Sequence, residues 1–356
     1  MPEAVDAAGL PQRWPVPTRP RPIVFIGAGA IVEHAHLPAY RRLGLPVAGF
    51  FDLNAARAAA MAERWPGARA FATLEDAAGW PDAVFDVAVP GGAVAGVLAQ
   101  LPEHSPVLVQ KPLGESLAEA RQIQAVCRAR SLVGALNFQL RFSPNVIAIK
   151  SLVDRGALGE LIDVEVRTVT YTPWELWSFM RGNPRLEILY HSVHYLDTVR
   201  YLLGEPRGVF TRTTRSQNPD YADVASANIL DYGPTRRVIV NAFHAHAPLL
   251  AHAMSELRVE GTQGAAVARM GVNLAYPTGE PDTLEIYTCG ADRFASVALR
   301  GSWFTEAFEG PMSNLQRFAT GEDTRLVSPI DDAVRTMALV EACYQASTAP
   351  ATPIPE

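Results

Sequence analysis

A glycine loop that directly follows an apolar run is the feature that most constrains the fold of this chain. Residues 22–26 read Pro-Ile-Val-Phe-Ile, which is typical of a strand buried on both faces. Gly27 and Gly29 permit a tight turn and a close approach of the backbone to a ligand. A helix opening at Ala30 would direct free N–H groups toward an anion. The pattern predicts a strand–loop–helix unit that binds a nucleotide pyrophosphate. An ordinary strand-to-helix turn is the alternative, because Val32 stands where G-x-G-x-x-G has its third glycine.

An acidic residue follows the second apolar run, residues 45–51. Asp52 lies 23 residues after Gly29, at a distance where a carboxylate accepts hydrogen bonds from ribose hydroxyls. The same carboxylate repels a 2′-phosphate, so the sequence favours NAD over NADP. The alternative is that Asp52 belongs to the turn before a helix over residues 54–65.

Strand-like and helix-like segments alternate up to residue 139, as expected of βαβ units. Such a sheet binds its ligand beyond the carboxyl ends of its strands, and Gly27, Asp52, Pro90 and Lys111 all follow expected strands. We therefore expect these four residues at one edge of the sheet. The remaining expected elements are strands at 68–72, 85–90, 106–110 and 132–139, a helix capped by Thr73 with Asp76 three residues on, and helices at 92–101 and 116–130, the last opened by a Ser116–Glu119 capping box.

The pattern changes after a linking helix at 143–156. Alternating apolar and polar residues predict an antiparallel sheet with one covered face. Its expected strands are 161–171, 209–217, 225–232, 237–246, 257–269, 284–289 and 296–300, and helices at 305–320 and 330–346 end the chain. The fold class is thus α/β. We expect a flexible proline-rich leader (1–20), a Rossmann dinucleotide-binding domain (21–140), and an α/β domain for substrate binding and oligomerisation (141–356), whose large open sheet is mostly antiparallel.

Charge and cysteine content exclude several classes of partner. The net charge is −6 and no run of Lys and Arg occurs, so a nucleic-acid partner is not expected. Cys127, Cys289 and Cys343 are far apart and form no C-x-x-C pair, so neither a disulfide framework nor a cysteine metal site is expected. No apolar stretch approaches the ~20 residues of a membrane helix, and residues 1–22 do not resemble a secretory signal. A cytoplasmic protein is expected.

Residues 187–204 predict a helix that carries polar groups on one stripe. At about 100° per residue, the other side is apolar and suited to packing on the sheet. The helix therefore resembles an active-site wall, and a solvated surface face is the alternative. The stripe consists of Glu187, Tyr190, His191, His194, Asp197 and Tyr201, and the apolar side of Leu189, Val193, Leu196, Val199 and Leu203.

The same helix offers a competing metal site. Glu187, His191 and His194 have i, i+4, i+7 spacing, and His191-x-x-His194-x-x-Asp197 is a second possible ligand set. We expect no metal, because a dinucleotide loop at the sheet edge explains more of the chain.

Five motifs, in order, resemble the glucose–fructose oxidoreductase / inositol dehydrogenase (Gfo/Idh/MocA) family over about residues 21–348. They are Gly27-x-Gly29-x-Ile31 with His36-Leu37-Pro38-Ala39, Val107-Leu108-Val109-Gln110-Lys111-Pro112-Leu113-Gly114, Asn137-x-x-x-Arg141-Phe142-Ser143-Pro144, Gly156-x-x-Gly159, and His194-x-x-Asp197.

The resemblance implies a Rossmann domain, a C-terminal α/β domain with a large open sheet, and oxidation or reduction of sugars, polyols and related carbonyls with NAD(P). It implies that Lys111 contacts the reacting hydroxyl, that Pro112 shapes the loop beside the nicotinamide, and that His194 is the general base. A homodimer or homotetramer is expected at family level.

Three positions depart from the family pattern. Gln110 replaces a glutamate, which removes a negative charge beside Lys111. Tyr190 stands where an aspartate would precede His194 by four residues, and Val94 stands where histidine is frequent. We expect an atypical member with a Tyr190–His194 pair and His191 as a second polar contact. The alternatives are a sugar- or dinucleotide-sensing regulator without catalysis and a redox-neutral glycosidase that uses NAD.

Alcohol oxidation requires a base for the hydroxyl proton while a hydride leaves for the nicotinamide. An imidazole such as that of His194 suits the base. Lys111 would stabilise the developing alkoxide, or else it is a surface lysine at a strand end. The expected catalytic residues are thus Lys111, His194 and Tyr190. The expected cofactor contacts are Gly27, Gly29, Ala30, Ile31, Asp52, Pro90, Gln110, Lys111 and Pro112. The expected substrate contacts are Arg141, Tyr171, Trp177, His191 and Asp197, of which Arg141, Tyr171 and Trp177 suit core or interdomain packing equally well.

Overall fold

The computed structural model of the chain describes residues 9–246, 251–274 and 279–355. The chain forms two compact units. The first unit consists of Gln12–Ile147 and Arg300–Met337, and the second unit contains Ala148–Leu299 and the residues from Ala338 onward. The first unit therefore reaches beyond the 21–140 range expected from the sequence, because residues 300–337 return to it.

A six-stranded parallel sheet forms the centre of the first unit, in the order β3-β2-β1-β4-β5-β6. This is the doubly wound order of dinucleotide-binding folds, and it confirms the predicted fold class. The central strands are short, apolar and buried on both faces, as expected of a parallel sheet covered by helices. The strands are β1 (Ile23–Ile26), β2 (Val47–Phe51), β3 (Arg69–Ala70), β4 (Val84–Val87), β5 (Pro106–Val109) and β6 (Val133–Leu136).

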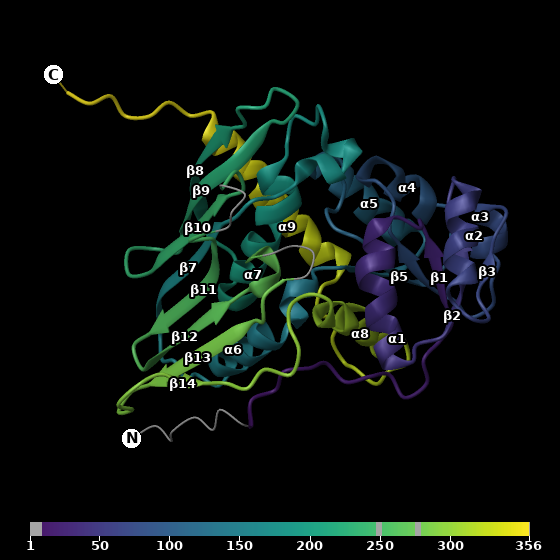
Figure 1. Cartoon of the computed structure of the whole chain (residues 1–356), viewed down its shortest axis with the longest axis horizontal. Helices are drawn as coiled ribbons and strands as arrows, with labels where there is room; N and C mark the ends of the chain where they lie inside the picture. The colour runs from purple at the N-terminus through teal and green to yellow at the C-terminus, as the bar shows by residue number, and fades with distance from the viewer. Residues whose placement is uncertain (1–8, 247–250, 275–278, 356) are drawn as a thin grey trace. The chain divides into compact units, whose positions relative to one another are not determined.

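The helices of the first unit begin at local signals in the sequence. Asn54 accepts hydrogen bonds from the N–H groups of Ala56 and Arg57, and Thr73 and Ser116 each accept from the N–H three residues on. The predicted cap at Ser116 is therefore confirmed, whereas the Glu119 carboxylate accepts from the N–H of Glu115 and not from that of Ser116, as a regular capping box requires. The helices are α1 (Leu37–Leu43), α2 (Ala55–Glu63), α3 (Leu74–Ala78), α4 (Gly91–Leu98), α5 (Leu117–Ala129) and α8 (Glu309–Ala319) (Figure 1).

Part of the expected flexible leader is held by specific contacts. Trp14 donates from Nε1 to Asp323 at 2.8 Å, and its ring meets that of Phe142 edge-on at 5.4 Å. The N–H of Thr18 donates to Glu322. Residues 14–18 are therefore ordered, unlike the expected flexible leader, because the Trp14 indole and the Thr18 N–H donate to Asp323 and Glu322, which follow α8.

The second unit contains an eight-stranded sheet in the order β14-β13-β12-β11-β7-β10-β9-β8. Only the β7–β10 pair among these strands is parallel, so the predicted mostly antiparallel sheet is confirmed. The strands are β7 (Leu161–Val169), β8 (Gly208–Arg215), β9 (Asp223–Asp231), β10 (Arg237–Phe243), β11 (Met254–Gly261), β12 (Gly264–Arg269), β13 (Thr283–Thr288) and β14 (Ala295–Ser296).

The single strand expected over 257–269 is wrong. Residues 254–269 form two antiparallel strands, β11 and β12, in which Gly261 pairs with Gly264. Thr262 and Gln263 form the two-residue turn between them, a loop length typical of hairpins. The apolar alternation continues on both sides of the turn, so the sequence pattern does not mark where the first strand ends and the second begins.

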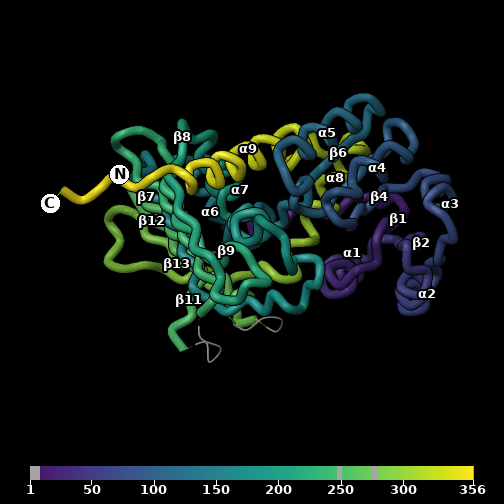
Figure 2. The backbone as a smooth tube through the Cα atoms, turned by 90° about the horizontal axis from the view of Figure 1, so that it is seen from above, coloured from purple at the N-terminus to yellow at the C-terminus, as the bar shows by residue number. Residues whose placement is uncertain are grey.

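Helices α6 (Pro144–Asp154) and α7 (Val193–Leu203) lie along one face of this sheet (Figure 2). The long helix α9 (Ile330–Ser347) passes from the first unit into the second. Burial alternates along β9, as expected of a sheet covered on one face. Among the residues described, no helix is long and apolar enough to cross a membrane.

Candidate active site

The glycine loop leaves β1 at the carboxyl edge of the parallel sheet. Gly27 has a φ of +101°, and a Cβ there would lie 2.3 Å from the carbonyl oxygen of Ala88, so only glycine fits. At Gly29 nothing lies within 4 Å of the Cβ position, which leaves open space beside the backbone. The N–H groups that follow, on Ala30 and Ile31, open a helix and lack acceptors one turn earlier. These features fit a bound pyrophosphate.

Asp52 binds this loop directly. Its Oδ2 accepts from the N–H of Ala28 at 2.8 Å, and its Oδ1 accepts from the N–H of Asn54 at 2.8 Å. Helix α2 is capped by Asn54, so Asp52 does not act as that cap. The carboxylate is half-buried, and its oxygens can accept further hydrogen bonds.

A buried polar cluster that the sequence did not reveal follows the loop. Residues Val32–His36 form a π-helical turn. Asp86 in β4 accepts from Tyr40 at 2.5 Å and lies 2.8 Å from Nδ1 of His36. Asn137 lies 3.2 Å from Nε2 of the same imidazole. Burial and the charge of Asp86 raise the pKa of Tyr40 well above its ordinary value. The motif histidine of the sequence analysis thus connects the loop helix to β4 and to the end of β6.

Lys111 follows β5, and register places this strand end at the same edge as the loop. Ile26 pairs with Val87, and Val87 pairs with Val109. Gln110 accepts at Oε1 from the N–H of Lys111 at 3.1 Å, and the Lys111–Pro112 peptide bond is cis. Burial lowers the pKa of the Lys111 ammonium to about 8. Pro90 precedes α4 at the end of the neighbouring β4 segment.

Arg141, a predicted substrate contact, makes hydrogen bonds within the first unit. Its side chain is 3% exposed. It donates to the carbonyl of Val327 at 2.7 Å and to Asp332 at 2.6 Å. The guanidinium thus connects two segments of the first unit. Its partners are almost two hundred positions away in the sequence.

The predicted helix of the second unit begins with a π-helical segment. Residues Ile188–Ser192 are π-helical and α7 follows from Val193, so the assumed spacing of about 100° per residue is wrong over the first five residues. Residues on both predicted faces are buried. Among the polar stripe, His191 is half-buried, whereas Tyr190 and His194 are 6% exposed.

Tyr190 and Asp197 have different surroundings on this helix. The phenol oxygen of Tyr190 accepts from Nδ2 of Asn183 at 3.2 Å, and its ring contacts that of Phe179. Asp197 is fully buried and lies 4.0 Å from Arg200, which in turn binds Glu205. Asp197 is therefore a buried counterion of Arg200, and its contact with a substrate stays a prediction.

Two of the expected substrate contacts, Tyr171 and Trp177, are aromatic. Tyr171 is 38% exposed and donates to Glu175 at 3.3 Å. Trp177 is half-buried. The neighbouring Trp174 is 5% exposed, and its ring lies 4.8 Å from the ring of His191.

Sequence reasoning missed a buried acid–imidazole pair. Nε2 of His244, directly after β10, lies 3.5 Å from Oε1 of Glu187. Nδ1 of His244 lies 2.8 Å from the hydroxyl of Thr172. The available signal was a histidine inside the expected strand 237–246, but nothing local associates that position with residue 187.

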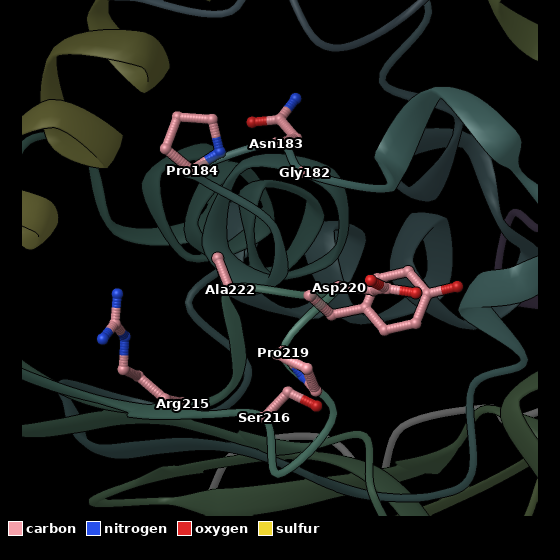
Figure 3. Close-up of a pocket in the computed structure, with 9 residues that line it drawn as sticks. Gly182, Asn183, Pro184, Arg215, Ser216, Pro219, Asp220 and Ala222 are labelled. Atoms are coloured by element: carbon pink, nitrogen blue, oxygen red, sulfur yellow. The ribbon is translucent and has the colours of Figure 1, made fainter.

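An open hollow of about 310 Å³ lies between two segments of the second unit (Figure 3). The loop 182–184 borders one side, and residues 215, 216 and 219–222 border the other. Asn183 belongs to the lining and also donates to Tyr190. The amide of Asn183 therefore connects the lining of the hollow to Tyr190, a predicted site residue.

Within residues 9–246, 251–274 and 279–355, no group of three His, Cys, Asp or Glu side chains is arranged to hold a metal ion. Glu187 is instead engaged by Ser192 and His244.

Two family models match this chain. Residues 21–138 match the oxidoreductase family with an NAD-binding Rossmann fold, and residues 146–267 match the GFO/IDH/MocA C-terminal domain. The chain belongs to the GFO/IDH/MocA family. The resemblance in the five motifs is thereby confirmed.

Individual members of the GFO/IDH/MocA family show how far the similarity extends. Inositol 2-dehydrogenase of Corynebacterium glutamicum is 36% identical over 184 residues, which cover 50% of this chain and 53% of that protein. The chain spans about half the length of the curated relatives first matched.

Two solved structures share the fold. An oxidoreductase from Agrobacterium radiobacter in complex with NAD+, L-tartaric acid and magnesium has a TM-score of 0.75 at 19% identity, covering 92% of this chain and 96% of that one. A super-repressor mutant of Gal80p from Saccharomyces cerevisiae has a TM-score of 0.78 at 16% identity, with the same coverage of both chains. At these identities the likeness concerns the fold alone.

Proposed function

We propose that this protein is an NAD-dependent oxidoreductase that transfers a hydride to or from a CH–OH group of a sugar, a polyol or a related carbonyl compound. One observation carries the proposal. The carboxyl edge of the parallel sheet gathers the Gly27–Gly29 loop, Asp52 and a lysine of lowered pKa. Relatives named inositol 2-dehydrogenase support the substrate class.

The residues at this edge fit a dinucleotide. The N–H groups of Ala30 and Ile31 would hold the pyrophosphate, and Asp52 would accept from the ribose hydroxyls while disfavouring a 2′-phosphate. Pro90, Gln110 and Pro112 would border the nicotinamide. When bound, the nicotinamide supplies the hydride acceptor or donor.

The acid–base roles are proposed residue by residue. His194 would take the hydroxyl proton during oxidation, and Tyr190 would hydrogen-bond the imidazole or the substrate hydroxyl. The Lys111 ammonium would stabilise the developing alkoxide. Tyr171, Trp177 and His191 would contact the substrate.

The test is a screen of sugars, sugar acids and inositols with NAD and NADP, which follows nicotinamide absorbance. We expect turnover with at least one polyhydroxy substrate, and we expect it to be lost in Lys111→Ala. Tight dinucleotide binding without turnover of any substrate would instead support the regulator alternative, which the absence of a motif glutamate at Gln110 favours. Release of a sugar from a glycoside without net change in the dinucleotide would support the NAD-using glycosidase.

A homo-oligomer formed through the uncovered face of the eight-stranded sheet is part of the proposal. Phe210 and Ile229 are paired across β8 and β9, and Ile239 continues the row on β10. Phe210 is 70% exposed and Ile229 is 51% exposed. An apolar row of this kind suits an isologous contact with a second copy.

A cytoplasmic location also belongs to the proposal. Cys127, Cys289 and Cys343 are free thiols, and free thiols suit a reducing compartment.

A further inference from the structure

Glu187 is a fully buried carboxylate at the start of the site helix. Its Oε1 accepts from the hydroxyl of Ser192 at 2.5 Å. Its Oε2 has no hydrogen-bond partner among the described residues. A buried carboxylate with so few donors is costly unless a group able to carry positive charge lies beside it.

His244 is the imidazole that lies beside this carboxylate. Both side chains are fully buried, and Nε2 of His244 is 3.5 Å from Oε1 of Glu187. The opposite ring nitrogen is 2.8 Å from the hydroxyl of Thr172. When Nε2 carries the proton toward Glu187, Nδ1 accepts from Thr172 or, in the charged ring, donates to it. Thr172 therefore orients the ring through Nδ1, while Nε2 makes no hydrogen bond among the described residues and lies at ion-pair distance from Glu187.

Glu187 raises the pKa of several acidic groups around it. Asp223 accepts from the N–H of Glu187 at 3.1 Å, and burial first, with the charge of Glu187 adding to it, raises the pKa of Asp223. The pKa values of Tyr344 and Cys343 are raised by burial first and by Glu187 among further causes. The guanidinium of Arg185 interacts electrostatically with Asp223 and Tyr344. His244 is thus the imidazole that lies against the Glu187 carboxylate.

His191 packs directly on this pair. Its ring meets the ring of His244 at 4.4 Å between centroids with an interplanar angle of 67°, and it meets Trp174 at 4.8 Å. His191 is half-buried, whereas His244 and Trp174 are buried. His244 and Trp174 thus contact the ring of a half-buried histidine from two directions.

We propose that Glu187 and His244 are positioning residues for His191, and that they hold its imidazole against Trp174 so that its exposed edge contacts a hydroxyl of the substrate. This inference rests on the proposed function and deepens it. The proposal explains why a buried acid–imidazole pair packs against the half-buried His191. The proposal makes His191 a determinant of substrate binding and assigns the chemical step to other groups.

The first experiment compares His244→Asn with His244→Gln. The amide nitrogen of Asn can replace Nδ1 and keep the contact with Thr172, whereas that of Gln can replace Nε2 and keep the contact with Glu187. With the best polyhydroxy substrate, His244→Asn should raise KM about tenfold with kcat within about twofold, because uniform binding is lost. His244→Gln should restore most of the affinity. His246→Gln, two residues along, is the matched control and should behave as the unmodified protein.

A double-mutant cycle separates positioning from general support of the fold. If His244 acts through His191, His244→Asn should raise KM no further in a His191→Ala background. An equal rise in both backgrounds would overturn the proposal. So would a loss in His244→Gln as large as that in His244→Asn.

A spectroscopic experiment needs no turnover and so remains decisive if the proposed oxidoreductase activity fails. The chain has eight histidines, and the imidazole signals of ¹⁵N-histidine-labelled protein can be assigned by the loss of one signal in His191→Ala. Glu187→Gln, which keeps the shape of the side chain, and His244→Asn should each shift the His191 signals, whereas His246→Gln should not. Unchanged His191 signals in Glu187→Gln, with thermal unfolding showing a folded protein, would overturn the proposal.

Discussion

Oδ2 of Asp52 accepts a 2.8 Å hydrogen bond from the N–H of Ala28, so the carboxylate proposed to select the cofactor also anchors the glycine loop. One side chain thus combines a structural contact with a candidate recognition contact. Two variants can separate these roles.

Asp52→Ala removes both the anchor and the charge. NAD binding should weaken about tenfold, because a hydrogen bond to a charged group contributes about 1.5–3 kcal/mol and the loop can partly relax. Asp52→Asn keeps an acceptor oxygen for Ala28, so NAD binding should change little while the preference over NADP narrows. Calorimetric titration of both dinucleotides measures these effects. Equal or tighter NADP binding by the unmodified protein would contradict the assignment.

Lys111→Ala should lower turnover about 100- to 1000-fold, as when one oxyanion donor is removed. Dinucleotide affinity should remain nearly intact, because the charge matters most when the alkoxide develops. The chain has one other lysine, Lys150, which lies on α6, and Lys150→Ala is the control. Near-normal turnover in Lys111→Ala would mean that this lysine is structural.

Burial lowers the pKa of Lys111 to about 8, so the ammonium predominates below pH 8 and the neutral amine above it. If the charged form is needed, kcat/KM for oxidation should fall as pH rises through about 8. It should rise on the acidic side as the His194 imidazole becomes neutral, giving a bell-shaped profile. Lys111→Arg, which stays charged, should lose the falling limb. A rate that keeps rising beyond pH 9 would instead make neutral Lys111 the base.

His194→Ala should abolish both the activity and the acidic limb of the profile. Tyr190→Phe removes only the oxygen that accepts from Asn183, so we expect turnover to drop about tenfold or more with the fold intact. Tyr201→Phe, further along the same helix, is the control. Wild-type behaviour of Tyr190→Phe together with an inactive His191→Ala would show that His191, and not Tyr190, is the partner of His194.

Asp86 should contribute strongly to stability, because Tyr40 and His36 both direct polar groups at it within a buried site. Asp86→Ala leaves both without an acceptor and should lower the free energy of unfolding by about 3–5 kcal/mol. Asp76→Ala, at the exposed start of α3, should cost at most about 1 kcal/mol. Urea unfolding of each variant measures the difference, and similar losses would refute the role of burial.

Ile229→Glu places a charge in the exposed apolar row of β9 and should dissociate the proposed homo-oligomer. Gln217→Glu adds the same charge at an exposed loop position and should leave it assembled. Sedimentation velocity of the three proteins decides the matter. A monomeric unmodified protein would exclude the contact.

Local information in the sequence was sufficient for much of the fold. The strand–glycine loop–helix unit and the caps at Asn54, Thr73 and Ser116 depend on neighbours within a few residues. Short apolar runs predicted the parallel sheet, and the alternation of apolar and polar residues predicted the antiparallel one, because such patterns report which faces of an element are buried. The two-residue turn at Thr262 was missed, since a short hairpin leaves that periodicity uninterrupted.

The tertiary structure alone decided which polar residues meet. Arg141 finds Asp332 and His244 finds Glu187 only because distant segments pack together. The π-helical turns at Val32–His36 and Ile188–Ser192 likewise shift side chains away from the positions that a regular helix gives them. Sequence patterns specify burial and local hydrogen bonds, whereas the pairing of buried charges depends on sheet register and helix packing, which no short segment encodes.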